Sequence, residues 1–144
     1  MDGFMEEAIA QARKSLEEGG IPIGAVLVKD GIIIGRGHNQ RVQKDAPILH
    51  AEIDCLQNAG RIGSYRGTTL YSTLSPCYLC SGAVVQFGIK KVVIGENETF
   101  AGAPEFLARH GVEVENLDLE ECKALMRRFI AEKPQLWNED IGEL

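Results

Sequence analysis

Long hydrophobic runs are absent from the sequence, and no segment approaches the roughly 20 consecutive apolar residues that a membrane-spanning helix needs. The first 20 residues carry acidic side chains early and have no apolar core. We therefore expect no targeting peptide, no membrane partner and a cytoplasmic location, with the nucleus as the alternative.

Clusters of basic residues are missing as well. The formal net charge is −6, and the densest basic spots are the pairs Lys90-Lys91 and Arg127-Arg128. A protein that binds nucleic acid usually presents a clustered basic face. We therefore expect both pairs to lie on a solvated surface, and we expect no nucleic-acid partner.

The chain also lacks internal repeats, low-complexity tracts and recognisable linkers. Its 144 residues are the usual size of one compact domain. A chain of this length buries enough surface to fold without disulfide crosslinks. We expect one domain over residues 1–144.

Hydrophobic periodicity and turn residues divide the chain into helices and strands. Asp2 is a candidate N-cap for the first helix, which Gly19-Gly20 ends, and Asp30-Gly31 predicts a hairpin between the first two strands. The expected helices span 3–18, 49–59, 77–87, 104–110 and 118–132, the expected strands span 24–30, 31–37, 68–74, 90–95 and 112–116, and a short tail follows Pro134. The alternation predicts a layered α/β domain whose later strands run parallel.

Two of the four cysteines form the spacing Cys77-x-x-Cys80. At the start of a helix, residues three apart share a face, so both thiolates can point at one ion. His50, at the start of the preceding helix, supplies a third ligand. Two Cys and one His leave the fourth tetrahedral position of zinc open for water, as in catalytic sites. No second Cys-x-x-Cys or HxxxH is present to close the site.

Two alternatives exist for these cysteines. Cys55 lies five residues after His50 and is a candidate fourth ligand, although we interpret it as a small buried apolar residue. A Cys-x-x-Cys pair also occurs in thioredoxin-like redox proteins, which usually lack a companion His-x-Glu on a separate helix.

The fragment His50-Ala51-Glu52 places a carboxylate two residues from a metal ligand. H-x-E together with P-C-x-x-C is the signature of zinc deaminases, in which the Glu is a general acid and base rather than a ligand. In that chemistry zinc supplies hydroxide, and one carboxylate moves a proton to the ring nitrogen and then to the departing amine. The two fragments predict a hydrolytic deaminase with Glu52 as its proton shuttle.

Beyond these fragments, the chain resembles the cytidine-deaminase-like superfamily and, within it, the fungal-type cytosine deaminases. The resemblance implies a three-layer α/β/α fold with a central five-stranded mixed sheet, one zinc ion per chain and a homodimer. It also implies a hydrolase acting on the C–N bond of a cyclic amidine, converting free cytosine to uracil and ammonia in pyrimidine salvage. The matching stretches are Gly20 to Gly24, Gly35 to Asn39, His50 to Ile53, Thr68 to Cys80, Gly95 to Asn97 with Phe100, and Pro134 to Glu143.

Carried over residue by residue, the resemblance implies a pocket for a pyrimidine base. Asn39 would pair with N1–H and O2 of the ring, and the backbone N–H of Ala51 would also reach O2. Asp140 and the carbonyl of Ser75 would accept hydrogen bonds from the exocyclic amine. Without the resemblance, Asn39 also fits a turn and Asp140 a solvated tail. The apolar residues that would enclose the ring are Phe100 and Trp137 as walls and Ile23 beneath.

Other functions on the same scaffold stay open. Ala51 stands where the fungal pattern has Gly, and His-Ala-Glu is common in guanine and tRNA adenosine deaminases. The alternatives are a deaminase of another free base, of guanine, isocytosine or aminotriazine type, and a tRNA adenosine deaminase, which would need a basic docking surface. A zinc-stabilised binding module without turnover is opposed by Glu52 and by the missing fourth ligand.

Overall fold

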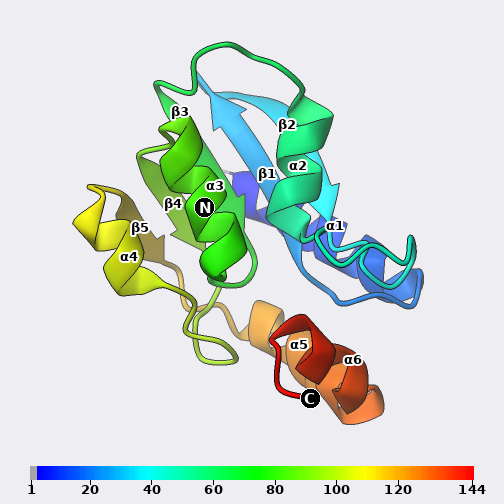
Figure 1. Ribbon diagram of the computed structural model, residues 1–144. Helices are drawn as coiled ribbons and strands as arrows, with labels where there is room; N and C mark the ends of the chain where they lie inside the picture. Colours follow the sequence, from blue (N-terminus) through cyan, green and yellow to red (C-terminus); the bar gives the residue numbers. More distant parts are fainter. Residues whose placement is uncertain (1–2) are drawn as a thin grey trace.

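The computed structural model describes residues 3–144 and contains one five-stranded mixed sheet of order β2-β1-β3-β4-β5 (Figure 1). β1 pairs antiparallel with both β2 and β3, whereas β3, β4 and β5 run parallel. The predicted sheet and its parallel half are therefore confirmed. The elements are α1 (Phe4–Glu17), β1 (Gly24–Lys29), β2 (Ile32–His38), α2 (Ala51–Ala59), β3 (Thr68–Ser72), α3 (Tyr78–Phe87), β4 (Lys91–Ile94), α4 (Pro104–Arg109), β5 (Glu113–Asn116), α5 (Glu120–Glu132) and α6 (Pro134–Asp140).

The hairpin between β1 and β2 turns at the two residues that the sequence singles out. Asp30 has φ 52° and Gly31 has φ 77°, the left-handed pair of a type I′ turn. That turn matches the twist of the flanking strands, which explains why an Asp-Gly pair fixes this connection.

The helices cover both faces of the sheet and produce three layers (Figure 1). On one face, α1 packs its buried side chains against β-strand residues such as Val26 and Tyr71. On the other face, α2 and α3 pack against the alternate strand residues, such as Leu27 and Leu70. Successive strand residues point to opposite faces, so both faces of these strands are apolar and buried.

Helix α2 lies unusually close to β2, and this contact places the start of the helix. A Cβ added at Gly37 would lie 2.2 Å from the backbone nitrogen of Cys55. Only glycine permits this approach. The contact seats α2 on the sheet with His50 as its N-cap.

The segment after Pro134, expected as a short tail, is instead helix α6. Pro134 occupies the beginning of this helix, where the missing N–H costs no hydrogen bond, so it starts a helix rather than ending one. The buried side chain of Trp137 seats the helix on the body. The expected N-cap Asp2 lies outside the described residues, and within residues 3–144 no helix is long and apolar enough to cross a membrane.

Candidate metal centre and base pocket

Three predicted ligands meet between the beginnings of two helices. His50 is the N-cap of α2, Cys77 is the N-cap of α3, and Cys80 lies in the first turn of α3. Their ligand atoms all lie within 4.8 Å of one another. Among residues 3–144, no other group of three or more His, Cys, Asp or Glu side chains is placed to hold a metal ion. The Nδ1 atom of His50 is 3.4 Å from the Sγ atom of Cys77.

This geometry fits zinc. Tetrahedral bonds of about 2.0 Å to nitrogen and 2.3 Å to sulfur separate the two ligand atoms by about 3.5 Å, close to the separation of His50 and Cys77. Two thiolates and a neutral imidazole balance the charge of the ion. Cys55 is fully buried and does not belong to the group. Burial raises the pKa of its thiol, as expected for an inert core cysteine.

The two cysteines of the group share a proton. The Cys80 thiol donates a hydrogen bond to Cys77, which is the main cause that lowers the pKa of Cys77 to about 4. The same hydrogen bond, together with burial, raises the pKa of Cys80 well above its usual value. Binding of a metal releases such protons, because only thiolates act as ligands.

Glu52 lies in the first turn of α2, beside the ligands but outside the ligand group. Its side chain is 4% exposed. Burial, followed by the negative charge of Cys77, raises its pKa to about 7. A carboxyl group with a pKa near neutrality can both accept and release a proton under physiological conditions, as acid–base catalysis requires.

The other side of the His50 ring faces the C-terminal helix. The Nε2 atom of His50 is 3.5 Å from Oδ1 of Asp140, and the Nε atom of Arg41 is 3.2 Å from the same oxygen. Burial raises the pKa of Asp140, while the nearby His50, Arg41 and Asn39 side chains lower it in part. A residue from the end of the chain thereby reaches the metal group.

A small cavity of about 20 Å³ lies beside the metal group. Most of the predicted site residues line it, whereas the predicted substrate-binding residues Asn39 and Ala51 and the predicted metal ligand Cys80 do not. The rings of Phe100 and Trp137 meet edge to face, with their centroids 6.1 Å apart. The lining residues are Ile23, His50, Glu52, Leu74, Ser75, Cys77, Phe100, Trp137, Asp140 and Ile141.

Backbone contacts fix two of the predicted substrate-binding residues. Ala51 is the first residue of α2, where backbone N–H groups have no partner within the helix. The N–H of Ser75 donates to the carbonyl of Glu96 at 3.0 Å, and its hydroxyl donates to Ala101 at 2.9 Å. Ser75 is therefore held by two hydrogen bonds, and the N–H of Ala51 has no acceptor within its helix.

Asn39 is fully buried directly after β2. Its N–H donates to the carbonyl of Ile23 at 3.0 Å, which places it behind the cavity wall. Its Oδ1 atom accepts a hydrogen bond from the backbone N–H of Arg41 at 3.0 Å. Its Nδ2 atom is buried and has no partner with good hydrogen-bond geometry among residues 3–144, although the Asn39 side chain lies near enough to Asp140 to lower the pKa of that group. An unpaired buried donor is costly, and a ligand that accepts its hydrogen bond would remove that cost.

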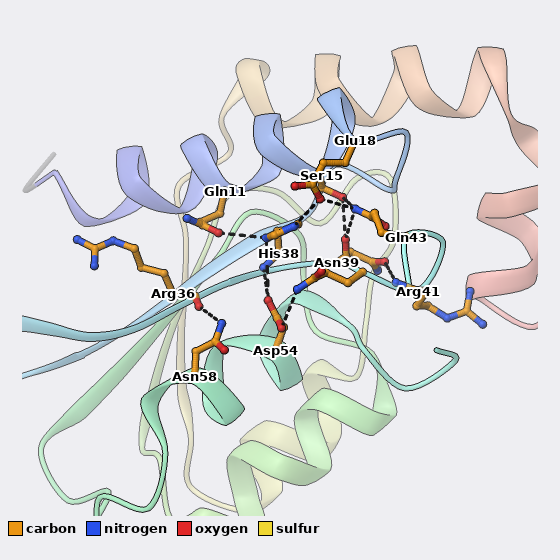
Figure 2. A network of polar contacts seen from close by, with 11 residues as sticks. Gln11, Ser15, Glu18, Arg36, His38, Asn39, Arg41, Gln43, Asp54 and Asn58 are labelled. Carbon is orange, nitrogen blue, oxygen red and sulfur yellow. Dashed lines mark hydrogen bonds and ion pairs between the residues drawn. The ribbon is translucent and has the colours of Figure 1, made fainter. Parts of the chain in front are cut away.

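Figure 2 shows the polar network that holds this segment. His38 is buried, with its Nε2 atom 2.9 Å from Glu18 and its Nδ1 atom 3.3 Å from Gln11. Its backbone N–H donates to the carboxylate of Asp54 at 3.0 Å. The network joins β2 to α1 and α2, and it holds the strand end that leads into Asn39.

Sequence reasoning missed three residues of this region. Leu74 and Ile141 line the cavity, and Arg41 contacts Asp140. Leu74 lies in an expected strand, where an apolar residue is ordinary, and Ile141 lies in the segment that was expected to be a tail. Arg41 gives no signal in the sequence, because its partner lies 99 positions later in the chain.

Comparisons with known proteins agree with this geometry. Residues 1–96 match the family model of the cytidine and deoxycytidylate deaminase zinc-binding region. The chain is 51% identical over 142 residues to a cytosine deaminase of Candida albicans, with 96% of this chain and 95% of that protein covered. It is 41% identical over 138 residues to a tRNA-specific adenosine deaminase of Streptococcus pyogenes, with 88% and 87% covered. A solved structure from work on A-to-I editing by tRNA:A34 deaminases is similar with a TM-score of 0.77 and 29% identity, covering 87% of this chain and 99% of that chain.

Proposed function

Because the chain belongs to the family of the cytidine and deoxycytidylate deaminase zinc-binding region, we propose that it hydrolyses free cytosine to uracil and ammonia. The observation that carries the proposal is the closed site in which Glu52 lies beside the group of His50, Cys77 and Cys80. The 51% identity to a cytosine deaminase over nearly the whole chain supports the choice of base.

One zinc ion per chain would be held by Nδ1 of His50 and by the Sγ atoms of Cys77 and Cys80. Such an ion lowers the pKa of its bound water towards neutrality and so supplies hydroxide. Glu52 takes one proton of that water and delivers it to N3 of the base as the water oxygen adds to C4. Glu52 then takes the proton that remains on this oxygen and delivers it to the amine, which leaves as ammonia when the C4–N bond breaks. Its raised pKa suits both directions of transfer.

The remaining pocket residues bind and orient the base. The unpaired Nδ2 atom of Asn39 donates to O2, its Oδ1 atom accepts from N1–H, and the backbone N–H of Ala51 adds a second donor to O2. Asp140 and the carbonyl of Ser75 accept from the exocyclic amine. The apolar side chains of Phe100, Trp137 and Ile23 enclose the ring and exclude water.

Free cytosine is favoured over a nucleoside for two reasons. A ribose on N1 removes the hydrogen that Asn39 accepts, and it needs room where α6 closes the cavity with Trp137 and Ile141. A site built to hydrogen-bond a group can reject an analogue that lacks it by about 10⁴-fold.

The test is ammonia release by the purified zinc-loaded protein with cytosine, cytidine, adenine, guanine and isocytosine. We expect cytosine to have the highest kcat/KM, and we expect the same preparation of Glu52→Gln to show no release above background, which excludes a contaminating enzyme. Equal or better use of cytidine would overturn the free-base proposal.

Editing of tRNA adenosine is the second candidate, because the chain is 41% identical to a tRNA-specific adenosine deaminase. The net charge of −6 opposes this function, since RNA binding relies on neutralising phosphates. The same ammonia assay with a tRNA anticodon stem-loop decides between the two candidates. A guanine, isocytosine or aminotriazine substrate would appear in the free-base series.

We also propose that the enzyme acts as a homodimer through the outer face of α2 and α3. An apolar groove of about 700 Å³ lies there, and it is bordered by Leu79 and Phe87, which are 43% and 47% exposed. Apolar patches of this kind mark interaction sites. We expect light scattering to give the mass of two chains, Phe87→Glu to give one chain, and Ile32→Glu on β2 to keep the dimer. A monomeric wild type would contradict the proposal.

The reaction would serve pyrimidine salvage in the cytoplasm, because it turns a free base into uracil. A cell that lacks cytosine deaminase and cannot make pyrimidines should grow on cytosine when it expresses this chain. Growth with the Glu52→Gln variant would contradict the role of the enzyme in that rescue.

A further inference from the structure

The geometry around the pocket points to Arg41 as a positioning residue that fixes the carboxylate of Asp140 and holds helix α6 against the body. This inference rests on the proposed function, because it concerns the residue that accepts the amine of the base. Its experiment nevertheless includes a readout that does not depend on turnover.

The Arg41 side chain connects three segments. Its Nε atom donates to the carbonyl of Pro47 at 2.8 Å, and the same atom forms an ion pair, without a hydrogen bond, with Oδ1 of Asp140 at 3.2 Å. Its terminal nitrogen is 3.8 Å from Glu139. The guanidinium therefore joins the loop before α2 to the last residues of α6.

The pair of Arg41 and Asp140 is shielded from water, with side chains that are 10% and 6% exposed. In the other arginine ion pairs among residues 3–144, both side chains are at least 48% exposed. Exposed pairs contribute little because solvent screens them, whereas removing one partner of a shielded pair leaves a buried charge behind. Arg41 is thus the arginine whose ion pair is the most shielded from solvent among residues 3–144.

Arg41 also contacts Asn39, the residue proposed to read the opposite edge of the base, and Figure 2 shows the two side by side. That contact is made by the backbone N–H of Arg41, which donates to Oδ1 of Asn39 at 3.0 Å. A side-chain substitution at position 41 removes the link to Asp140 but keeps the backbone donor. The two roles can therefore be separated by mutation.

Loss of the guanidinium leaves His50 as the remaining ion-pair partner of Asp140, at 3.5 Å. The carboxylate is then free to draw water into the site or to turn away from the amine, and α6 loses a fixed contact at its end. Displacement of a positioning group by about 1 Å can cost roughly 100-fold in rate. Lysine would restore the charge but not the Nε–H that donates to Pro47 beside Asp140.

The experiment compares the wild type with R41Q, R41K, D140N and the double variant R41Q/D140N, with R36Q as the matched control. Arg36 is an exposed arginine paired with Glu7 on the far side of the His38 network. We expect kcat/KM for cytosine to fall about 10- to 100-fold in R41Q, less in R41K, and not at all in R36Q, with one zinc per chain throughout. In the D140N background, R41Q should change kcat/KM less than twofold.

The second readout is acrylamide quenching of Trp137, the only tryptophan of the chain, which is 6% exposed on α6. R41Q should increase this quenching, and R36Q should not. The inference would be overturned if R41Q had the quenching and the kcat/KM of the wild type. It would also be overturned if R41Q and D140N lowered kcat/KM independently of each other. If R41Q does not fold, R41K replaces it in both measurements. Failure of the wild type to deaminate cytosine would overturn the proposed function, while the quenching data would still test the role of Arg41.

Discussion

Substitution of Asn39 by alanine tests whether this side chain recognises the base. The side chain is fully buried, its Oδ1 atom accepts one hydrogen bond from Arg41, and its Nδ2 atom has no partner among residues 3–144. The variant therefore loses one hydrogen bond within the protein and the groups proposed to bind the base.

The size of the effect follows from these contacts. A polar group of the base left unpaired in a closed pocket costs about 1–3 kcal/mol, which corresponds to a fall of about 5- to 150-fold in kcat/KM for each unpaired group. The lost hydrogen bond to Arg41 costs about 1 kcal/mol of folding stability, and removal of the unpaired buried Nδ2 donor offsets part of that cost. Asn39 does not belong to the metal group, so zinc content should not change.

The assay measures kcat/KM for cytosine, the zinc content and the free energy of unfolding in urea. The matched control is Asn116→Ala, because the Oδ1 atom of Asn116 accepts a hydrogen bond from the backbone N–H of Asp118 at 2.8 Å in the same local pattern, on the exposed end of β5. The control should lose at most a similar stability and no catalytic efficiency. Normal kcat/KM in folded, zinc-loaded Asn39→Ala would refute the proposed recognition of the base.

Three further predictions address the metal, the proton and the C-terminal helix. Cys77→Ser should lose zinc and lower the melting temperature, and a chelator should do the same to the wild type; full metal occupancy in Cys77→Ser would exclude Cys77 as a ligand. Glu52→Gln should keep zinc and fold while kcat falls by about 10²–10⁴-fold or more, and half of the wild-type activity would mean that another group moves the proton. Deletion of residues 134–144 should abolish cytosine turnover with zinc retained, and normal turnover would show that α6 is not part of the pocket.

Local spacing in the sequence was sufficient to predict the hairpin and the grouping of the cysteines. Asp30-Gly31 adopts the paired positive φ angles that only a few residue types tolerate. Cys77 and Cys80 share a helix start, so their spacing alone brings their thiols together. In both cases the deciding interaction spans fewer than five residues.

The contacts of α6 could not be predicted in the same way. A proline at position 134 can end α5 or begin a new helix, and the sequence alone does not distinguish the two. The burial of Trp137 against the body favours the new helix. The meeting of Asp140 with His50 and Arg41 spans at least 90 positions. It depends on how α6 packs against the body, which periodicity and capping patterns do not encode.

The size of the cavity shows which part of the fold has to move during a catalytic cycle. Its volume of about 20 Å³ is enough for about one water molecule, so binding of a pyrimidine base requires displacement of the lining. The metal ligands and Glu52 lie at the starts of α2 and α3, which are seated on the sheet. The rest of the lining includes Trp137, Asp140 and Ile141, and α6 is a short helix near the end of the chain. Because α6 is short and lies near the end of the described chain, we expect its displacement to admit the base and to release uracil.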